Sequence, residues 1–153
     1  MKINKLQKCD LKNALELVWS VFQKFEVPDY PEQGVTHFKD YISYSSIVEK
    51  FDKGELSFWG CFISDELTGI IATRGISHIS LLFVREEFHK QGIARQLFRA
   101  LVETSQRDKG IKKITVNSSP YAVEVYHHLG FTDTSTEQIR DGIRFTPMEF
   151  TLG

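Results

Sequence analysis

The chain has few of the residues that hold small extracellular or metal-dependent proteins together. Its 153 residues include only two cysteines, Cys9 and Cys61. They lie far apart and match no disulfide framework, metal-binding or redox spacing. We expect two buried free thiols, which suits a reducing compartment and predicts a cytoplasmic location. The histidines include the adjacent pair His127 and His128, but neighbouring helical residues point about 100° apart, so no metal site is expected.

Long apolar runs and a strong excess of charge are also absent. No run approaches the length needed to span a membrane. The polar residues at the start of the chain predict that there is no signal peptide. The formal net charge is −1, so neither nucleic acid nor an anionic membrane is expected as a partner. The length fits one domain over residues 1–153, large enough to bury a substantial core.

The most informative stretch is residues 81–98. It begins as an apolar run typical of a buried strand and continues as a polar loop. It becomes helical at Gly92, because Ile93, Leu97 and Leu101 then recur at helical spacing. A strand that passes through a glycine-containing loop into a helix suits phosphate, since the helix starts with unpaired N–H groups and the positive end of its dipole.

Two common phosphate-binding loops do not match this stretch. A Walker loop needs a second glycine followed by Lys and Ser or Thr, and a dinucleotide fingerprint needs three glycines early in a βαβ unit. This loop has one glycine, Gly92, followed by Ala94. An ordinary turn, in which Gly92 only permits the backbone to bend, remains the alternative.

A second stretch, residues 114–131, predicts a strand, a helix start rich in Ser and Pro, a short helix and a stop at Gly130. Together the two stretches resemble the signatures of the GNAT superfamily of acetyl-CoA-dependent N-acyltransferases. The first stretch matches the acyl-CoA loop, with His89 where Arg or Gln is usual and Glu86 where Pro is frequent. The second matches at the following positions: Asn117, Ala122, Tyr126, Leu129, Gly130 and Phe131.

The predicted fold class is α/β, with a mixed, mainly antiparallel sheet and helices on both faces. Hydrophobic patterning predicts helices at 11–26, 35–42 and 92–109. The pattern of the second helix weakens at 43–46, and residues 47–51 add one more turn. Strands are predicted at 1–7, 56–63, 67–74, 76–84, 114–116 and 142–152. Strands joined by short links should be antiparallel, whereas the helix between the strands 76–84 and 114–116 implies a parallel pair. Pro147 favours a sheet edge or a bulge.

The resemblance implies acetyl-CoA as cosubstrate, with its pantetheine arm between the strands that end at Val84 and Asn117. The Leu82 amide would then face the thioester carbonyl and stabilise the oxyanion. The residues implied to bind the coenzyme are Leu82, Phe83, Val84, His89, Lys90, Gln91, Gly92, Ile93, Ala94, Arg95, Asn117 and Tyr126.

Acyl transfer to an amine requires a base for the amine proton and an acid for the departing thiolate. Tyr126 matches the family's general acid; the alternative is a tyrosine packed in the core. His78 stands where many members carry a glutamate base, and it would share a strand face with Ser80 and Leu82. A strand histidine that is simply hydrogen-bonded is the equal alternative.

Acidic residues in the loop that follows the first helix provide further base candidates. Glu26, Asp29 and Glu32 lie in or beside this loop, which lines the acceptor pocket in the family. Each is otherwise a solvated loop acid. The same acids, with a neighbouring aromatic residue, indicate a cationic amine as acceptor.

The implied function is transfer of an acetyl group to a primary amine of a small molecule or peptide, by direct attack in a ternary complex. A non-catalytic acyl-CoA-binding or regulatory module is the alternative function. Nothing in the sequence identifies the amine acceptor. Dimers are frequent in families of this kind, so a homodimer is among the expected assemblies.

Overall fold

The computed structural model describes residues 1–108 and 110–153. Its helices are α1 (Leu11–Phe25), α2 (Glu32–Tyr41), α3 (Tyr44–Asp52), α4 (Ile93–Gln106) and α5 (Val123–Leu129). Its strands are β1 (Lys2–Lys5), β2 (Leu56–Ile63), β3 (Glu66–Arg74), β4 (His78–Val84), β5 (Lys113–Ser118), β6 (Thr132–Asp133), β7 (Gln138–Arg140) and β8 (Ile143–Thr151).

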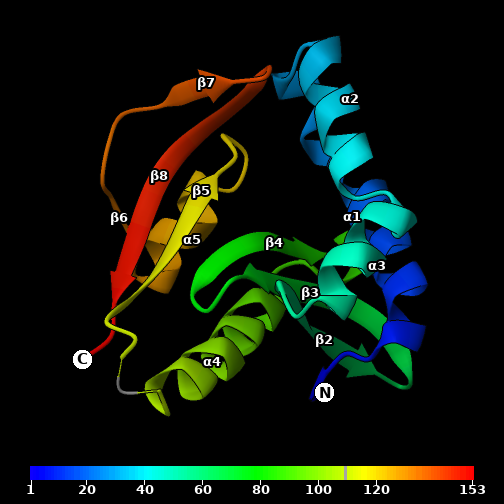
Figure 1. Ribbon diagram of the computed structural model, residues 1–153, viewed down its shortest axis with the longest axis vertical. Coiled ribbons are helices and arrows are strands. Elements are labelled where there is room, and N and C mark those ends of the chain that lie inside the picture. Colours follow the sequence, from blue (N-terminus) through cyan, green and yellow to red (C-terminus); the bar gives the residue numbers. More distant parts are fainter. Residues whose placement is uncertain (109) are drawn as a thin grey trace.

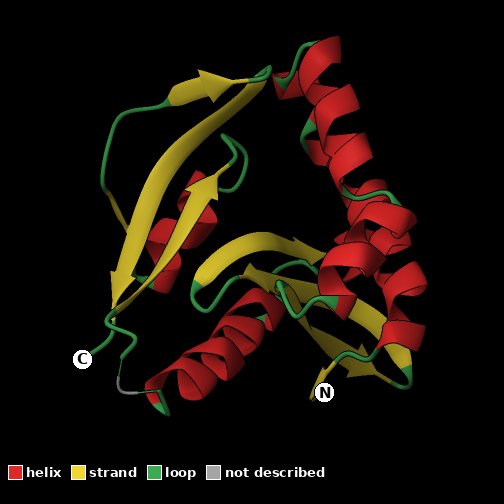
Figure 2. Ribbon diagram, viewed as in Figure 1, coloured by secondary structure: helices red, strands yellow, loops and turns green. Residues whose placement is uncertain are grey.

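The described strands form a mixed sheet in the order β1-β2-β3-β4-β5-β8-β6, and β7 pairs with β8 (Figures 1 and 2). Every neighbouring pair is antiparallel except β4 and β5. The parallel pair follows from the α4 crossover between them. The predicted hairpin between β2 and β3 has two turn residues, Ser64 and Asp65, both with positive φ, which matches the twist of the two strands. The predicted fold class is therefore confirmed.

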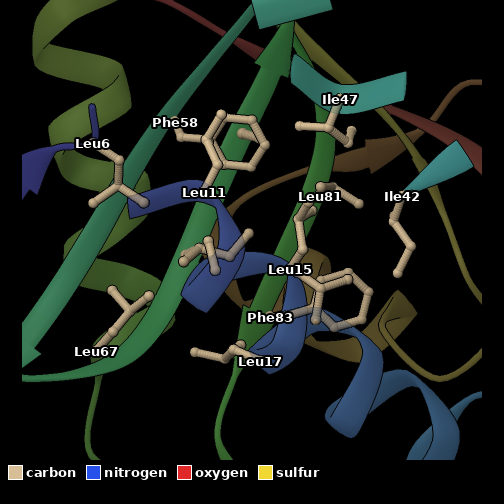
Figure 3. Close-up of a cluster of buried hydrophobic side chains, with 14 of the residues drawn as sticks. Leu6, Leu11, Leu15, Leu17, Ile42, Ile47, Phe58, Leu67, Leu81 and Phe83 are labelled. Atoms are coloured by element: carbon tan, nitrogen blue, oxygen red, sulfur yellow. The ribbon is translucent and has the colours of Figure 1, made fainter. Parts of the chain in front are cut away.

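Helices cover both faces of the sheet because each buries one apolar stripe. On one face, α1, α2 and α3 pack over β2, β3 and β4, and the predicted stripe of α1 is buried there (Figure 3). On the other face, α4 and α5 cover a second cluster that includes Ile71, Ile79 and Met148. The alternation of β2 explains this division, since Phe58 belongs to the first cluster and Trp59 to the second.

The two halves of the sheet part along β4 and β5. These strands pair only at His78 with Thr115 and at Ile79 with Val116. Beyond this point β5 continues beside β8, and Figure 1 shows β5 and β8 set apart from β2–β4. The predicted separation of these two strands is therefore present, and it leaves one side of the β4 backbone without a neighbouring strand.

A β-bulge lies where the separation begins. Ala72 pairs with Leu81 and Thr73 with Ile79, so Ser80 is an extra residue in β4. A bulge reverses the alternation of side chains along a strand. Ile79 and Leu82 therefore face the α4 side, whereas Leu81 and Phe83 face the α1 side.

Several element boundaries differ from the sequence prediction. The second helical region is two helices, α2 and α3, divided at Ile42 and Ser43. Helix α4 ends at Gln106, and the predicted end at Lys109 lies outside the described residues. Asp10, predicted as a helix cap, instead accepts the Gln7 amide within the 3-10 turn that precedes α1, at 2.8 Å.

Pro147 occupies a local edge of the sheet. Its carbonyl accepts the Thr134 amide on the side of β8 that faces β6 and β7. In an antiparallel strand the N–H of a residue points to the same side as its carbonyl. The nitrogen of Pro147, which has no hydrogen, therefore faces the interval between the β6 and β7 pairings.

Both cysteines are free thiols; Cys61 is buried as expected, whereas Cys9 is exposed. Among the described helices, none combines the length and the apolar character that crossing a membrane requires.

Candidate active site

Two cavities meet where β4 and β5 separate. The first, of about 260 Å³, lies on the α1–α2 side and is lined by aromatic side chains of α1, α2, β4 and β8. The second, of about 580 Å³, lies beside the start of α4 and along α5. Four residues line both cavities: Glu26, Leu82, Phe83 and Ala122. A molecule in one cavity can therefore meet a molecule in the other at these residues.

Glu26 is the acidic residue of this junction. It follows the last turn of α1, and its exposed fraction is only 7 %. Burial, which is the largest cause, and the charge of Asp29 together raise the pKa of its carboxyl from 4.5 to about 7. The neighbouring Ser119 hydroxyl opposes this shift. A carboxyl with this pKa is present in both protonation states near neutral pH, as an acid–base catalyst requires.

Tyr126 lies in the wall of the first cavity. It comes from α5, and its exposed fraction is 4 %. Burial, aided by the charge of Glu26, raises the pKa of the Tyr126 phenol well above its usual value. The phenol therefore stays protonated at neutral pH and can donate a proton.

The backbone of β4 offers hydrogen-bonding groups to the junction. The Arg85 amide donates to the Thr68 carbonyl at 2.8 Å, toward β3. Successive residues of a strand point their backbone groups to alternate sides. The backbone groups of Leu82 and Val84 therefore point to the opposite side, where β5 has separated from β4.

The second cavity ends at the predicted phosphate loop. Lys90, Gly92, Ile93, Ala94 and Arg95 line it. Both Lys90 and Gly92 have positive φ, at 63° and 78°, and α4 starts directly afterwards. Backbone amides gathered by such turns form a concave anion site, to which the dipole of a 14-residue helix adds. The loop thus has the geometry of a phosphate site.

His89 has a contact that the sequence did not predict. Its Nε2 lies 2.7 Å from the Val84 carbonyl, and its ring packs against Phe25 with centroids 5.2 Å apart. Phe25 stacks in turn on Tyr121 at 5.1 Å. His89 therefore joins the phosphate loop to α1, and the Val84 carbonyl keeps one lone pair for a further donor.

His78 lies away from the junction. Because of the bulge at Ser80, His78 faces the α1 side, so the prediction that it shares a face with Leu82 is wrong. Its Nδ1 lies 2.8 Å from the Thr115 hydroxyl. Burial and the charge of Arg74 lower the pKa of His78, which leaves the ring neutral in the wall of the first cavity.

The other predicted site residues divide between the two cavities. Asn117 and Tyr126 both line the first cavity and not the second, whereas Gln91 lines neither cavity. Asn117 does not cap α5; the Ser119 hydroxyl instead accepts the Ala122 amide at 3.3 Å. Of the three candidate acids of the loop, only Glu26 reaches a cavity, because Asp29 and Glu32 line neither.

Sequence reasoning missed several residues of the first cavity. Tyr30 donates to the Arg144 carbonyl at 3.3 Å, and Arg144 also reaches the Asp29 carbonyl and the Glu137 carboxylate. Ser119 lies beside Glu26. No spacing in the sequence marks these residues, since they come from separate elements. Glu26 was among the predicted base candidates, and its burial had a signal in the sequence: it follows Val18 and Phe22 at intervals of four, so it continues the buried stripe of α1.

A comparison with known protein families agrees with this geometry. The family model of the acetyltransferase (GNAT) domain matches residues 26–152. The chain belongs to the GNAT acetyltransferase family. No curated protein matches the chain by sequence.

Solved structures show the same fold at low sequence identity. The GCN5-related N-acetyltransferase from Rhodopseudomonas palustris is 15% identical with a TM-score of 0.84, over 99% of this chain and 95% of that one. PaiA N-acetyltransferase from Thermoplasma acidophilum, solved with coenzyme A, is 21% identical with a TM-score of 0.80, over 98% of each chain. Spermidine N-acetyltransferase from Vibrio cholerae, solved with coenzyme A and spermine, is 17% identical with a TM-score of 0.68, over 99% and 95%.

Proposed function

We propose that this protein is an N-acetyltransferase that transfers the acetyl group of acetyl-CoA to the primary amine of a small molecule or peptide. The observation that carries the proposal is the position of Glu26. This buried carboxyl has a pKa of about 7 and lines both cavities at their junction. Solved structures of the same fold with coenzyme A support the choice of cosubstrate.

In this proposal the second cavity holds the coenzyme. The amides of the loop around Gly92 and the start of α4 bind the pyrophosphate, assisted by Lys90 and Arg95. The pantetheine arm lies along the β4 backbone at Leu82 and Val84, where it replaces the missing β5 neighbour. This arrangement brings the thioester to the junction, within reach of an amine in the first cavity.

The proposed reaction is a direct attack. Glu26 takes one proton from the ammonium group, and the free amine attacks the thioester carbon. The Leu82 amide stabilises the oxyanion that forms. The C–S bond then breaks and Tyr126 protonates the departing thiolate. The second proton lost by the nitrogen restores the Tyr126 phenol, and Glu26 releases the first proton to solvent. The products are the acetamide, free coenzyme A and one proton released to solvent.

Glu26 is assigned as the base in preference to His78. His78 lines the first cavity but faces away from Leu82, whereas Glu26 shares the junction with Leu82. The assignment of Tyr126 as acid follows both from its match to the family motif and from its protonated phenol.

The test is release of free thiol from acetyl-CoA with a panel of primary amines. The proposal predicts release that requires an amine and that falls by about 10² to 10⁴ in Glu26→Gln, the usual range for an acid–base group. Mass spectrometry of the acetylated amine identifies the product. Coenzyme binding without thiol release, across the whole panel, would instead favour the non-catalytic acyl-CoA-binding module.

A further inference from the structure

Three aromatic rings connect the phosphate loop to the start of α5 beside the second cavity. The ring of His89 packs against Phe25 with centroids 5.2 Å apart, and Phe25 stacks on Tyr121 at 5.1 Å with 28° between the ring planes. His89 and Tyr121 line the second cavity, whereas Phe25 lines neither cavity. Phe25 therefore lies behind the cavity wall and joins its two lining rings.

The stack of Phe25 on Tyr121 reaches from one half of the structure to the other. Phe25 ends α1, which packs on β3 and β4, whereas Tyr121 lies between β5 and α5 on the far side of the separation. Each ring is next in sequence to a residue that lines both cavities, Phe25 to Glu26 and Tyr121 to Ala122. The stack therefore lies directly beside the junction of the two cavities.

Tyr121 is unusually exposed for a stacked aromatic residue. Its exposed fraction is 40 %, and that of Val125, four residues later in α5, is 39 %. Both side chains line the second cavity, so they offer apolar surface to a molecule bound there. A tyrosine ring has few rotatable bonds, and the stack on Phe25 restricts this one further. Packing a ligand against it therefore costs little conformational entropy.

We propose that Tyr121 packs against the pantetheine arm of the coenzyme and holds it against the β4 backbone. This inference rests on the proposed function, because it concerns the coenzyme assigned to the second cavity. An arm that runs from the phosphate loop to the junction passes between Leu82 and Val84 of β4 and the Tyr121 ring. The arm has amides for hydrogen bonds with β4, and methyl and methylene groups for apolar contact with the ring.

A matched pair of ligands tests the inference by titration calorimetry. The pair is free coenzyme A and its nucleotide part, which keeps all the phosphates but lacks the pantetheine arm. We expect Tyr121→Ala to weaken binding of coenzyme A about tenfold and to leave binding of the nucleotide part unchanged, because only the arm meets the ring. Tyr121→Phe keeps the ring and should bind both ligands as the wild type does. Tyr44→Ala, at an exposed tyrosine of α3 outside both cavities, is the control.

Unchanged binding of coenzyme A in Tyr121→Ala would overturn the inference. An equal loss for both ligands would also overturn it, because the ring would then act on the nucleotide end or on the fold. Amine-dependent thiol release by the wild type separates this failure from that of the proposed function. A loss limited to coenzyme A, without thiol release by the wild type, leaves the inference standing and refutes the enzyme. Thiol release together with coenzyme binding that does not depend on Tyr121 leaves the enzyme standing and refutes the inference.

Discussion

Gly34 and Gly142 are in backbone contact beside the first cavity, which Asp141 and Ile143, the two neighbours of Gly142, line. A Cβ on Gly34 would lie 2.3 Å from the Gly142 carbonyl oxygen, so only glycine permits this approach. The contact joins α2 to the turn between β7 and β8, as Figure 1 shows, and the Tyr30 and Asp29 contacts with Arg144 reinforce it. The contact therefore joins the α1–α2 side of the structure to the β7–β8 side, next to the proposed acceptor site.

Gly34→Ala should push this bridge apart. We expect a loss of about 1–3 kcal/mol in the free energy of unfolding, because the clash is with backbone rather than a movable side chain. The KM for the amine should rise, while coenzyme affinity is unchanged. Thr36→Ala, exposed on the same helix, is the control. Unchanged stability and KM in Gly34→Ala would show that the bridge is not tight in solution.

The dependence of kcat/KM on pH should show the ionisation of the Glu26 carboxyl. A general base must be deprotonated, so kcat/KM should rise with pH up to about 7, the pKa of Glu26. In Glu26→Gln the rise of kcat/KM toward pH 7 should disappear along with most of the activity. Steady-state rates measured across pH 5 to 9 give this profile. A wild-type profile that is flat through this range would contradict the assignment of Glu26.

The same carboxyl should make stability depend on pH. In the unfolded chain the carboxyl ionises near 4.5, but in the folded protein only near 7. Unfolding therefore releases a proton between these values, and stability falls as pH rises, by about 3 kcal/mol in total. Above pH 7 the loss is complete.

Glu26→Gln removes this ionisation, so its melting temperature should exceed that of the wild type by several degrees at pH 8. Near pH 4.5, where the wild-type carboxyl is protonated, the difference should vanish. Glu32→Gln, exposed in the same region, should show neither effect. An equal difference between wild type and Glu26→Gln at both pH values would mean that the carboxyl is not desolvated.

Tyr126→Phe should lower kcat more than it changes either KM. The substitution removes only the phenol oxygen, which the proposal assigns to protonating the thiolate, and the expected loss is about 10²-fold. Tyr44→Phe, at an exposed tyrosine, is the matched control. Full activity in Tyr126→Phe would instead favour the alternative that Tyr126 is only a packed core tyrosine.

Coenzyme A should stabilise the fold, and Gly92→Ala should reduce this effect. A ligand at about 100 times its dissociation constant contributes roughly 2.7 kcal/mol, a shift of several degrees for a chain of this size. Gly92 has a φ of 78°, which an alanine adopts at a cost of about 1–2 kcal/mol. ATP and NAD are the ligand controls. Equal shifts with all three nucleotides would argue against a coenzyme-specific cavity.

Local patterns in the sequence were sufficient for the elements and for the loop that we propose to bind the coenzyme. The stripe of α1, the hairpin at Ser64 and Asp65 and the helix stop at Gly130 depend on neighbouring residues alone. The loop around Gly92 is also continuous in the chain, so its phosphate geometry could be predicted before the fold was known.

The position of His78 could not be predicted in this way. Its side chain faces opposite to the simple alternation because Ser80 is an extra residue in β4. A bulge is defined by pairing with a partner strand, and a single strand carries no sign of it. The division of the second helical region into α2 and α3 was likewise only indicated by a weakening pattern.

The sequence by itself determined the α/β elements, their order, the parallel pair and the loop before α4, because each follows from residues close together in the chain. Only the tertiary structure decided which of the acids after α1 is buried, namely Glu26, and where the two cavities meet. The pKa of a side chain depends on how far it is removed from water, and a binding site depends on several side chains meeting at one place. Both arise only when residues distant in sequence are brought together.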